Sequence, residues 1–349
     1  MKYENIVVRV GRMPLPGALT ADAYEYCAEP LEALKPGEIR IETIYASIDA
    51  GARGMLDPSA NYPMLLRPGN RVYTSGVVGR VIESLDPAFV PGEFVRALSV
   101  TRQKYLTVAP KRTLGVRKVD PSDGPLHIHI GSLGMTGFTA WIGTFTIGLP
   151  KPGETMLVSA AAGAVGSVAG QIAKAIGARV VGIAGGAEKC SAVVSRFGFD
   201  ACIDYKSDGL GEAMDAACPV GIDIYFENVG GAIQKLAMER MNMFGRIIMC
   251  GQVSQYDGNG GGSEGGPNLM NVINRRLNLR GFISSDHMDA FPAFERSALS
   301  LVRSGKLISY ATVTKGFDQL HDAVNSLTQG RNFGQQVHQM ADDPMTSDC

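Results

Sequence analysis

The sequence offers little material for a disulfide framework or a zinc knuckle. It has six cysteines, and no two of them form a C-x-x-C pair. We therefore expect a reducing, cytoplasmic environment. Long hydrophobic runs are also missing, since none approaches the roughly 20 apolar residues that span a bilayer, and the first residues lack the apolar core of a signal peptide. The scattered cysteines are Cys27, Cys190, Cys202, Cys218, Cys250 and Cys349.

The chain has no large excess of positive or of negative charge. The chain carries 33 lysines and arginines against 34 aspartates and glutamates, a net charge of −1. Proteins that bind nucleic acid or an anionic membrane usually carry a basic excess, so we expect neither partner. What the chain does contain is 349 residues, 45% of them hydrophobic and 19% charged, which suits about two globular domains.

The segment 155–184 predicts a strand, a glycine turn, a helix and a second strand. An apolar run at 156–158 is followed by small residues and then by apolar residues at helical spacing. Gly163 and Gly166 occupy the last two glycine positions of the dinucleotide fingerprint G-x-G-x-x-G, and Ala161 stands at the first.

A turn of small residues ahead of a helix presents free backbone N–H groups to an anion, and it lets a pyrophosphate approach the backbone closely. A close-packed turn without a ligand would contain the same glycines, but the complete strand–helix–strand context favours dinucleotide binding. The residues that would hold the pyrophosphate are Gly163, Ala164, Val165, Gly166 and Ser167.

The pattern of elements predicts an α/β protein of two domains. Residues 1–125 contain short strand candidates separated by proline, glycine and aspartate, which predicts a small barrel or sandwich. In 126–310 six strands alternate with helices, one of them expected at 232–243, which predicts a doubly wound parallel sheet. Residues 311–340 return to strands around one helix and are expected to rejoin the first domain. The polar tail 341–349 is expected to be disordered.

Several motifs stand in a recognisable order along most of the chain. With them the sequence resembles the medium-chain dehydrogenase/reductase superfamily. Within it, the sequence is similar to the zinc-free, NADPH-dependent double-bond reductases, the group of prostaglandin reductase/leukotriene B4 12-hydroxydehydrogenase and the alkenal reductases. The motifs are LGMTGFTA at 133–140, KPGET at 151–155, AAAGAVGS at 160–167, GQIAK at 170–174, FENVGG at 226–231, FGRI at 244–247 with CG at 250–251, and GRNFG at 330–334.

This resemblance implies a GroES-like β-barrel domain, an inserted Rossmann domain and a cleft between them. It also implies a homodimer in which the Rossmann sheets join edge to edge. The strand expected at 278–283 is the candidate edge, and an ordinary internal strand is the alternative.

The end of the second strand decides between NAD and NADP. An NAD-binding unit usually has an Asp or Glu there that accepts from the ribose hydroxyl, whereas this chain reads Ala-Gly-Gly-Ala at 184–187. A missing carboxylate removes the repulsion of a 2′-phosphate, and Lys189 follows closely as a donor. The resemblance assigns the 2′-phosphate to Lys189 and Tyr205, so we predict NADP as the cofactor. A solvated pair of Glu188 and Lys189 is the alternative.

The resemblance implies further cofactor positions. Asn228 lies at a strand end, where ligands of this fold bind, although it could equally be a turn-forming asparagine. Cys250 is interpreted as a small apolar strand end rather than a reactive thiol. The positions on the ribose and nicotinamide side, with one from the C-terminal segment, are Met135, Thr139, Asn228, Cys250, Val253, Ser254, Phe282, Ile283, Ser284 and Asn332.

No metal site is predicted. Zinc alcohol dehydrogenases of the superfamily have a catalytic cysteine and a Gly-His-Glu motif, and neither occurs here around 43–49 or after it. His127 and His129 alternate, which would place them on one face of an extended segment, but two histidines alone make a poor zinc site. Without a Lewis acid, oxidation of an alcohol is disfavoured.

The resemblance implies hydride transfer from NADPH to the β-carbon of an α,β-unsaturated aldehyde or ketone, followed by protonation of the α-carbon. Tyr256 matches the tyrosine that plant enzymes place near the carbonyl, so it is the candidate catalytic residue, as carbonyl ligand or proton donor. The ribose hydroxyl of the cofactor could do the same work. A loop tyrosine that only covers the cofactor is the structural alternative for Tyr256.

One motif departs from the family. Its members commonly read Asp-Pro-Tyr-Met-Arg where this chain has Asp-Ala-Gly-Ala-Arg at 49–53, so Gly51 replaces an active-site tyrosine. We expect either a wider pocket or polar contacts from Tyr62 or Tyr73. The glycine-rich loop 256–267 is expected to be either a mobile lid or a plain disordered connection.

Two other functions remain open at this point. A quinone oxidoreductase of the same superfamily would share the fold and the cofactor. A cofactor-binding protein with a structural or nucleic-acid role is the alternative from another class, and the net charge of −1 argues against its nucleic-acid form.

Overall fold

The computed structural model describes residues 4–60, 62–256 and 266–346. The chain divides into two compact units, Met1–Met135 with Ala311–Cys349, and Thr136–Tyr310. The chain therefore passes from the first unit to the second after Met135, later than the expected boundary at 126. The reason is the 3-10 turn Leu126–Ile130, whose Leu126 and Ile130 are buried with Ile44 and Val78 of the first unit.

The second unit contains a parallel sheet of six strands in the order β10-β9-β8-β11-β12-β13. This is the strand order of a Rossmann fold, and it confirms the predicted α/β class and all six expected strands. The candidate edge strand lies at the end of the sheet. The strands are β8 (Thr155–Val158), β9 (Arg179–Ala184), β10 (Ala201–Asp204), β11 (Ile222–Glu227), β12 (Met241–Met249) and β13 (Asn278–Gly281).

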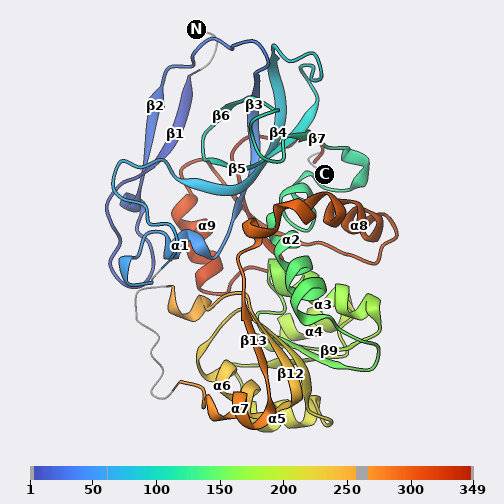
Figure 1. The fold of residues 1–349 in the computed structure, drawn as a ribbon. Helices are drawn as coiled ribbons and strands as arrows, with labels where there is room; N and C mark the ends of the chain where they lie inside the picture. Colours follow the sequence, from blue (N-terminus) through green and yellow to red (C-terminus); the bar gives the residue numbers. More distant parts are fainter. Residues whose placement is uncertain (1–3, 61, 257–265, 347–349) are drawn as a thin grey trace. The chain divides into compact units, whose positions relative to one another are not determined.

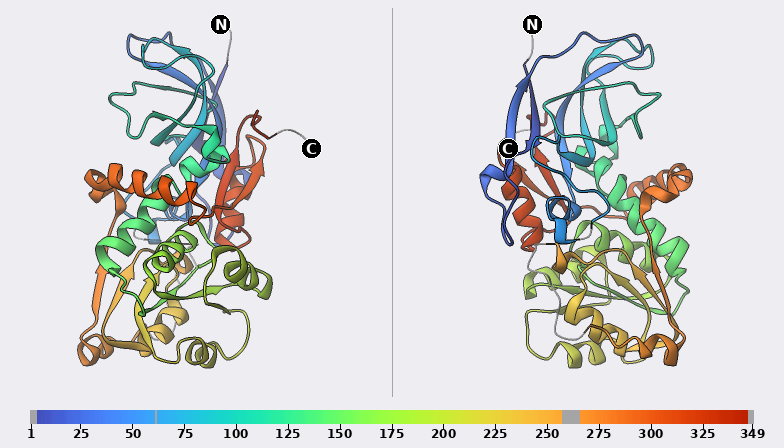
Figure 2. Two further views of the ribbon diagram at one scale, coloured as in Figure 1. Left: turned by 90° about the vertical axis from the view of Figure 1, so that its right-hand side faces the viewer. Right: turned by 60° about the vertical axis from the view of Figure 1, so that its left-hand side comes forward.

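Helices connect these strands and lie on both sides of the sheet (Figures 1 and 2). Strand side chains alternate in direction, so neighbouring residues meet different helices. Leu157 and Tyr225 are buried with residues of α5 and α6, whereas Gly182 approaches Val193 of α4 and Phe226 approaches Gly143. The helices are α2 (Met135–Ile142), continued by a π-helix (Gly143–Gly148), α3 (Ala164–Ile176), α4 (Ala187–Phe197), α5 (Leu210–Ala217), α6 (Gly231–Glu239), α7 (Met270–Arg275) and α8 (Phe291–Arg303).

The helix expected at 232–243 is too long, because α6 ends at Glu239. The next residues already belong to the sheet. Met241 is fully buried and pairs with Ile222 of β11, and the Ile222 N–H donates to the Arg240 carbonyl at 3.1 Å. Pairing with a distant strand therefore overrides the local helical pattern.

The first unit is built on a mixed sheet in the order β14-β15-β3-β4-β5-β7, with β6 paired to β3. Strand β15 pairs antiparallel with β3, so the C-terminal strands, red in Figure 2, lie beside the blue strand β3. The elements are β1 (Asn5–Val10), β2 (Tyr24–Glu29), β3 (Ile39–Ile48), α1 (Gly51–Gly54), β4 (Tyr73–Ser84), β5 (Phe94–Thr101), β6 (Tyr105–Val108), β7 (Arg117–Lys118), β14 (Ala311–Lys315), α9 (Leu320–Thr328) and β15 (Gln335–Gln339).

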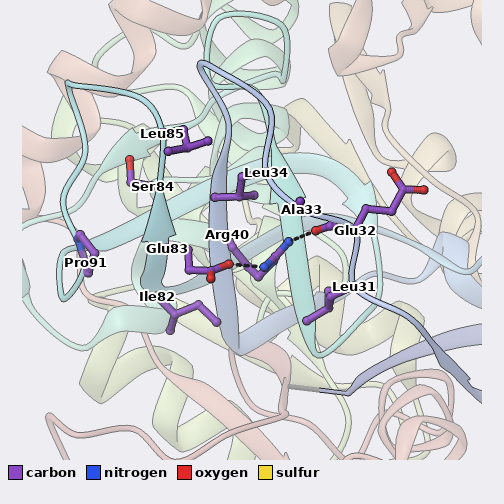
Figure 3. Close-up of a pocket in the computed structure, with 10 residues that line it drawn as sticks. All are labelled: Leu31, Glu32, Ala33, Leu34, Arg40, Ile82, Glu83, Ser84, Leu85 and Pro91. Atoms are coloured by element: carbon purple, nitrogen blue, oxygen red, sulfur yellow. Dashed lines mark hydrogen bonds and ion pairs between the residues drawn. The ribbon is translucent and has the colours of Figure 1, made fainter. Parts of the chain in front are cut away.

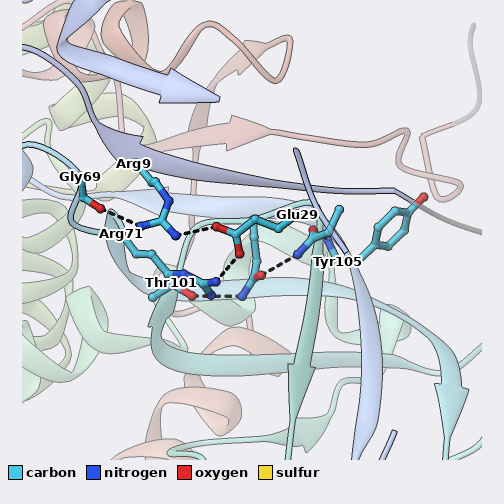
Figure 4. A network of polar contacts seen from close by, with 8 residues as sticks. Arg9, Glu29, Gly69, Arg71, Thr101 and Tyr105 are labelled. Atoms are coloured by element: carbon cyan, nitrogen blue, oxygen red, sulfur yellow. Dashed lines mark hydrogen bonds and ion pairs between the residues drawn. The ribbon is translucent and has the colours of Figure 1, made fainter. Parts of the chain in front are cut away.

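A polar network attaches the β1–β2 hairpin to the rest of this unit (Figure 4). The Glu29 carboxylate accepts from Arg9 at 2.6 Å and also from Arg71. The side-chain amide oxygen of Asn5 accepts from the Tyr105 N–H at 2.9 Å. The hairpin is thus held to the starts of β4 and β6 by side chains as well as by backbone.

The C-terminal tail is ordered further than expected. Asp343 is buried, and one of its carboxylate oxygens accepts from the Tyr45 hydroxyl at 3.0 Å. Its other oxygen accepts from the Met345 N–H at 2.9 Å, which closes a turn. The expectation of disorder from Ala341 onward is therefore wrong for the described part of the tail, and 347–349 lie outside the described residues.

Within the described part of the chain, no helix is long and apolar enough to cross a membrane.

Candidate functional site

The candidate site is built on the carboxyl ends of β8 and β11, where the strand order of the parallel sheet reverses. Ligands of open α/β sheets bind at this point. Asn228, directly after β11, donates its N–H to the Ser159 hydroxyl at 2.8 Å and its side-chain amide to the Ser159 carbonyl at 2.7 Å. The side chain of Asn228 therefore ties the two strand ends together.

The glycine turn after β8 leads directly into α3. Gly163 stands at the helix start, and no side chain caps the helix, so the first N–H groups of the helix have no intrahelical partner. A side-chain carbon on Gly166 would lie 2.4 Å from the Ala160 carbonyl oxygen, so only glycine allows this close approach. The bare helix start, with Ala164, Val165 and Ser167 in its first turn, fits the pyrophosphate of a dinucleotide.

The end of β9 leads into a small basic region. The Tyr205 ring packs on Gly185, since a side-chain carbon there would lie 2.9 Å from the ring. Lys189 lies in the first turn of α4, and burial together with the nearby charge of Lys206 lowers its pKa. A carboxylate is present after all, because Asp204 ends the neighbouring strand β10, and it accepts from the Gly186 N–H at 2.7 Å.

Sequence reasoning missed Asp204 and Lys206. The prediction considered only the residues directly after β9, whereas Asp204 and Lys206 lie at the end of the adjacent strand β10. Asp204 also accepts from the Lys206 N–H at 3.0 Å, so backbone groups partly neutralise its charge. Two lysines and an exposed tyrosine thus lie together at the end of β9, and lysines there are suited to bind a phosphate such as that of NADP.

The loop after β12 rests on the loop after β11. The Cys250 N–H donates to the Glu227 carbonyl at 3.0 Å, the Val253 N–H to the Asn228 carbonyl at 3.0 Å, and the Ser254 N–H to the Val229 carbonyl at 3.1 Å. Burial raises the pKa of the Cys250 thiol to about 12. This agrees with its interpretation as an apolar strand end.

Tyr256 closes the same loop. Its hydroxyl oxygen accepts from the Gln252 N–H at 3.3 Å, and its own N–H donates to the Val253 carbonyl at 3.2 Å. Burial raises the pKa of Tyr256, so the hydroxyl keeps its proton and can donate it in a hydrogen bond. The glycine-rich stretch that follows, 257–265, lies outside the described residues.

The remaining predicted cofactor residues fall in two places. The Thr139 hydroxyl of α2 donates to the Ser284 hydroxyl at 3.0 Å, which brings two of them together, and Phe282 and Ile283 precede Ser284 after β13. Asn332 belongs to the first unit, where its buried side chain donates to the Gly334 carbonyl at 2.9 Å. Met135 is the first residue of α2 and the last of the first unit's N-terminal segment.

Tyr62 fills the space beside Gly51 in the first unit. A side-chain carbon on Gly51 would lie 2.0 Å from the Tyr62 hydroxyl oxygen, and one on Gly54 would lie 2.9 Å from its ring. The glycine that departs from the family motif therefore does not leave open space. Tyr73, the other tyrosine considered from the sequence, is exposed at the start of β4.

The two histidines do not lie on an extended segment as expected. His127 and His129 belong to the 3-10 turn Leu126–Ile130, because Leu126, Ile128 and Ile130 all bury their side chains. Burial, together with the charge of Arg96, lowers the pKa of His129 to about 4. Among the residues that the structure describes, no three His, Cys, Asp or Glu side chains form a group that could hold a metal ion. Zinc does not fit these residues.

A pocket of about 780 Å³ lies in the first unit (Figure 3). Its buried cation, Arg40, is bound to the Glu83 carboxylate and the Glu32 carbonyl. The pocket contains none of the predicted site residues, and its cation is already satisfied. Its lining consists of Leu31, Glu32, Ala33, Leu34, Arg40, Ile82, Glu83, Ser84, Leu85 and Pro91.

Comparisons with known proteins extend over both units. Family models described as "N-terminal domain of oxidoreductase" and "Zinc-binding dehydrogenase" match residues 12–116 and 164–302. The 2-alkenal reductase (NADP(+)-dependent) of Nicotiana tabacum is 37% identical over 302 residues, 86% of this chain and 86% of that protein. The NADPH-dependent curcumin reductase of Escherichia coli (strain K12) is 37% identical over 312 residues, 88% of this chain and 89% of that protein.

A solved structure is similar to almost the whole chain. The crystal structure of CurA in complex with NADPH from Vibrio vulnificus has a TM-score of 0.87 and 33% sequence identity. The likeness covers 97% of this chain and 100% of that one.

Proposed function

The chain belongs to the medium-chain dehydrogenase/reductase superfamily, in its group of zinc-free, NADPH-dependent double-bond reductases, and we propose that it reduces the C=C bond of α,β-unsaturated aldehydes and ketones. The observation that carries this proposal is the identity of 37% with a 2-alkenal reductase and with a curcumin reductase, in each case over more than four fifths of the chain. The basic region at the end of β9 supports NADPH as the cofactor.

The chemistry divides between cofactor and protein. Bound NADPH supplies the hydride. The helix start at Gly163–Ser167 would hold the pyrophosphate, and Lys189 and Tyr205 would hold the 2′-phosphate. The loops that carry Asn228 and Ser254 would hold the nicotinamide side of the cofactor. The protein's contribution is orientation and hydrogen bonding.

Tyr256 is the proposed donor to the substrate. When the β-carbon gains the hydride, negative charge develops on the carbonyl oxygen, and one positioned donor there lowers the barrier by about 3 kcal/mol. A tyrosine hydroxyl keeps its proton at neutral pH, and burial raises the pKa of Tyr256 further. Protonation of the α-carbon completes the reduction, from Tyr256 or from the ribose hydroxyl of the cofactor.

Oxidation of NADPH and NADH with a panel of substrates tests the function. We expect NADPH to be consumed with an enal and an enone, with saturated product seen by mass spectrometry and no effect of a chelator. NADH should be a poorer donor because it lacks the 2′-phosphate. Turnover of a quinone without reduction of any activated alkene would contradict the proposal and select the quinone oxidoreductase alternative.

Lys189 should set the preference for NADPH. Replacing it in Lys189→Ala removes a charged hydrogen bond worth about 1.5–3 kcal/mol, so the KM for NADPH should rise roughly 10- to 100-fold while the KM for NADH stays unchanged. Lys174→Ala is the matched control, because Lys174 lies in the same unit and pairs with Asp200 at 2.9 Å. An equal rise in the KM for NADPH and the KM for NADH would show that Lys189 does not bind the 2′-phosphate.

Tyr62 is proposed to supply the substrate contact that Gly51 lacks. Tyr62→Phe should lower kcat/KM for an enone by about three- to tenfold, the value of one neutral hydrogen bond, with the Kd for NADPH unchanged. Gly51→Ala should lower it at least as much, because its added carbon displaces the Tyr62 ring. Tyr73→Phe is the control, and a loss there with normal activity of Tyr62→Phe would assign the role to Tyr73.

A second copy of the chain is the proposed partner of β13. This strand ends the sheet, and apolar side chains gather near it: Phe244 of β12 and Ile273 of α7 are each 66% exposed, and Leu279 of β13 is partly exposed. The Arg276 guanidinium, at the end of α7, lies 4.9 Å from the centre of the Phe244 ring, which joins α7 to β12. An exposed edge strand with apolar neighbours is a template for pairing.

Light scattering coupled to gel filtration tests this dimer. The wild-type protein should have twice the chain mass of 37.1 kDa, and Ile273→Asp should shift it toward the single-chain mass. Val220→Asp is the control, since Val220 is 70% exposed in the turn before β11 and belongs to no part of this surface. A wild-type protein of single-chain mass at micromolar concentration would contradict the proposal.

We propose a cytoplasmic location because of the state of the cysteine thiols. The cysteines that the structure describes are all free, which suits a reducing compartment. Cell fractionation should recover the enzyme with cytoplasmic markers, and recovery from the cell exterior would contradict this location.

A further inference from the structure

Glu227 is a carboxyl group in the middle of the parallel sheet. It is the last residue of β11, with strands β8 and β12 on either side, and it is 0% exposed. A buried carboxyl is costly unless hydrogen-bond donors surround it. No part of the hydride-transfer scheme above uses Glu227, so its presence in the core requires another explanation.

Four hydrogen-bond donors surround the carboxyl. One oxygen accepts from the Val229 N–H at 2.6 Å, the Gly230 N–H at 3.0 Å and the Ser159 hydroxyl at 3.1 Å. The other oxygen accepts from the Tyr225 hydroxyl at 2.8 Å. Burial raises the pKa of Glu227, and these hydrogen bonds act in the opposite direction. A carboxyl group has enough acceptor sites on its two oxygens to satisfy all four groups at once.

The donors on the first oxygen shape the loop after β11. Gly230 and Gly231 adopt the left-handed region, with φ of 83° and 61°, and the Glu227 oxygen binds the N–H groups on the near side of this turn. The turn then presents its carbonyls outward. The Asn228 carbonyl accepts from the Val253 N–H, and the Val229 carbonyl accepts from both the Ser254 N–H and the Ser254 hydroxyl.

An unbroken series of hydrogen bonds therefore runs from Glu227 to the proposed carbonyl ligand. One branch leads from Val229 to Ser254. The other leads from Asn228 to Val253, and the Val253 carbonyl accepts from the Tyr256 N–H at 3.2 Å. The main chain of Glu227 adds to it, because its carbonyl accepts from Cys250 and Gly251 at 3.0 and 3.1 Å. The carboxyl thus underlies both loops of the candidate site.

We propose that Glu227 is a positioning residue: its buried carboxyl group sets the turn 228–231 and, through it, the loop 250–256 that carries Tyr256. The inference rests on the proposed function for its catalytic consequence, and on the geometry alone for the shape of the loops. Ser159 shares in the role, since its hydroxyl donates to Glu227 and accepts from the Asn228 N–H.

The principal variant is Glu227→Met, which keeps the length of the side chain and removes both acceptors. We expect the Kd for NADPH, measured by fluorescence quenching, to rise at least tenfold, and kcat for an enone to fall with it. Glu227→Gln restores an acceptor for the turn and should recover most of both losses. Tyr225→Phe is the matched control, because it removes the donor on the far oxygen and leaves the turn bound, so its kinetics should remain close to wild type.

Two readouts separate positioning from general destabilisation. Amide hydrogen exchange of the cofactor-free protein should show Val253, Ser254 and Tyr256 opening faster in Glu227→Met, with β8 and β9 unchanged. A double-mutant cycle should show that Ser254→Ala adds nothing to Glu227→Met, because both hold Val229, Glu227 through the Val229 N–H and Ser254 through the Val229 carbonyl.

Three results would overturn the inference: unchanged exchange at 253–256, additive effects of the two substitutions, or an equal loss in Tyr225→Phe. Should the wild-type protein reduce no alkene, the proposed function fails, while the exchange and NADPH-binding measurements still decide the role of Glu227.

Discussion

The parallel pairing of β8 with β11 is the constraint on which the candidate site depends. After β8 the chain crosses to one side of the sheet and returns at β9, and after β11 it crosses to the other side and returns at β12. The two loops therefore diverge from adjacent strand ends. Because Val158 and Phe226 are paired in register, Ser159 lies level with Glu227, and the N–H of the next residue, Asn228, can donate to the Ser159 hydroxyl.

The same pairing explains why several polar side chains are buried at the carboxyl ends of β8 and β11. Strand ends leave N–H and carbonyl groups without sheet partners, and a closely packed interior excludes the water that would otherwise satisfy them. Glu227, Ser159 and Tyr225 supply the missing partners from side chains. Such a network stabilises a unique arrangement only when it is complete, which makes the loops it supports stiff relative to a loop held by packing alone.

The sequence predicted what is local and repeated. The strand–turn–helix at 155–184 was readable because apolar spacing and small residues act within one short segment, and the six alternating strands followed from the same pattern. What it could not predict depends on distant partners. The end of α6 is set by the pairing of Met241 with Ile222. Tyr62 occupies the space at Gly51 through side-chain packing, which produces no periodic pattern in the sequence.

The candidate site shows the same division. Motifs located Asn228, Cys250, Val253 and Ser254, and the structure brings these four together through backbone hydrogen bonds. Asp204 was missed because it reaches the end of β9 from a neighbouring strand. The two histidines were misjudged because alternation of apolar residues over five positions cannot distinguish a strand from a 3-10 turn buried on several sides.

The position of β15 between β14 and β3 has a consequence for how the chain acquires its structure during synthesis. The second unit is one continuous segment, so all its strands have left the ribosome while the C-terminal strands are still being made. The first unit has to wait, because residues 45–48 of β3 lack their partner strand until β15 has been made, whereas residues 39–42 already pair with β6. Throughout that interval this part of β3 presents an open edge to other nascent chains, so it is a segment of the first unit that a chaperone would protect.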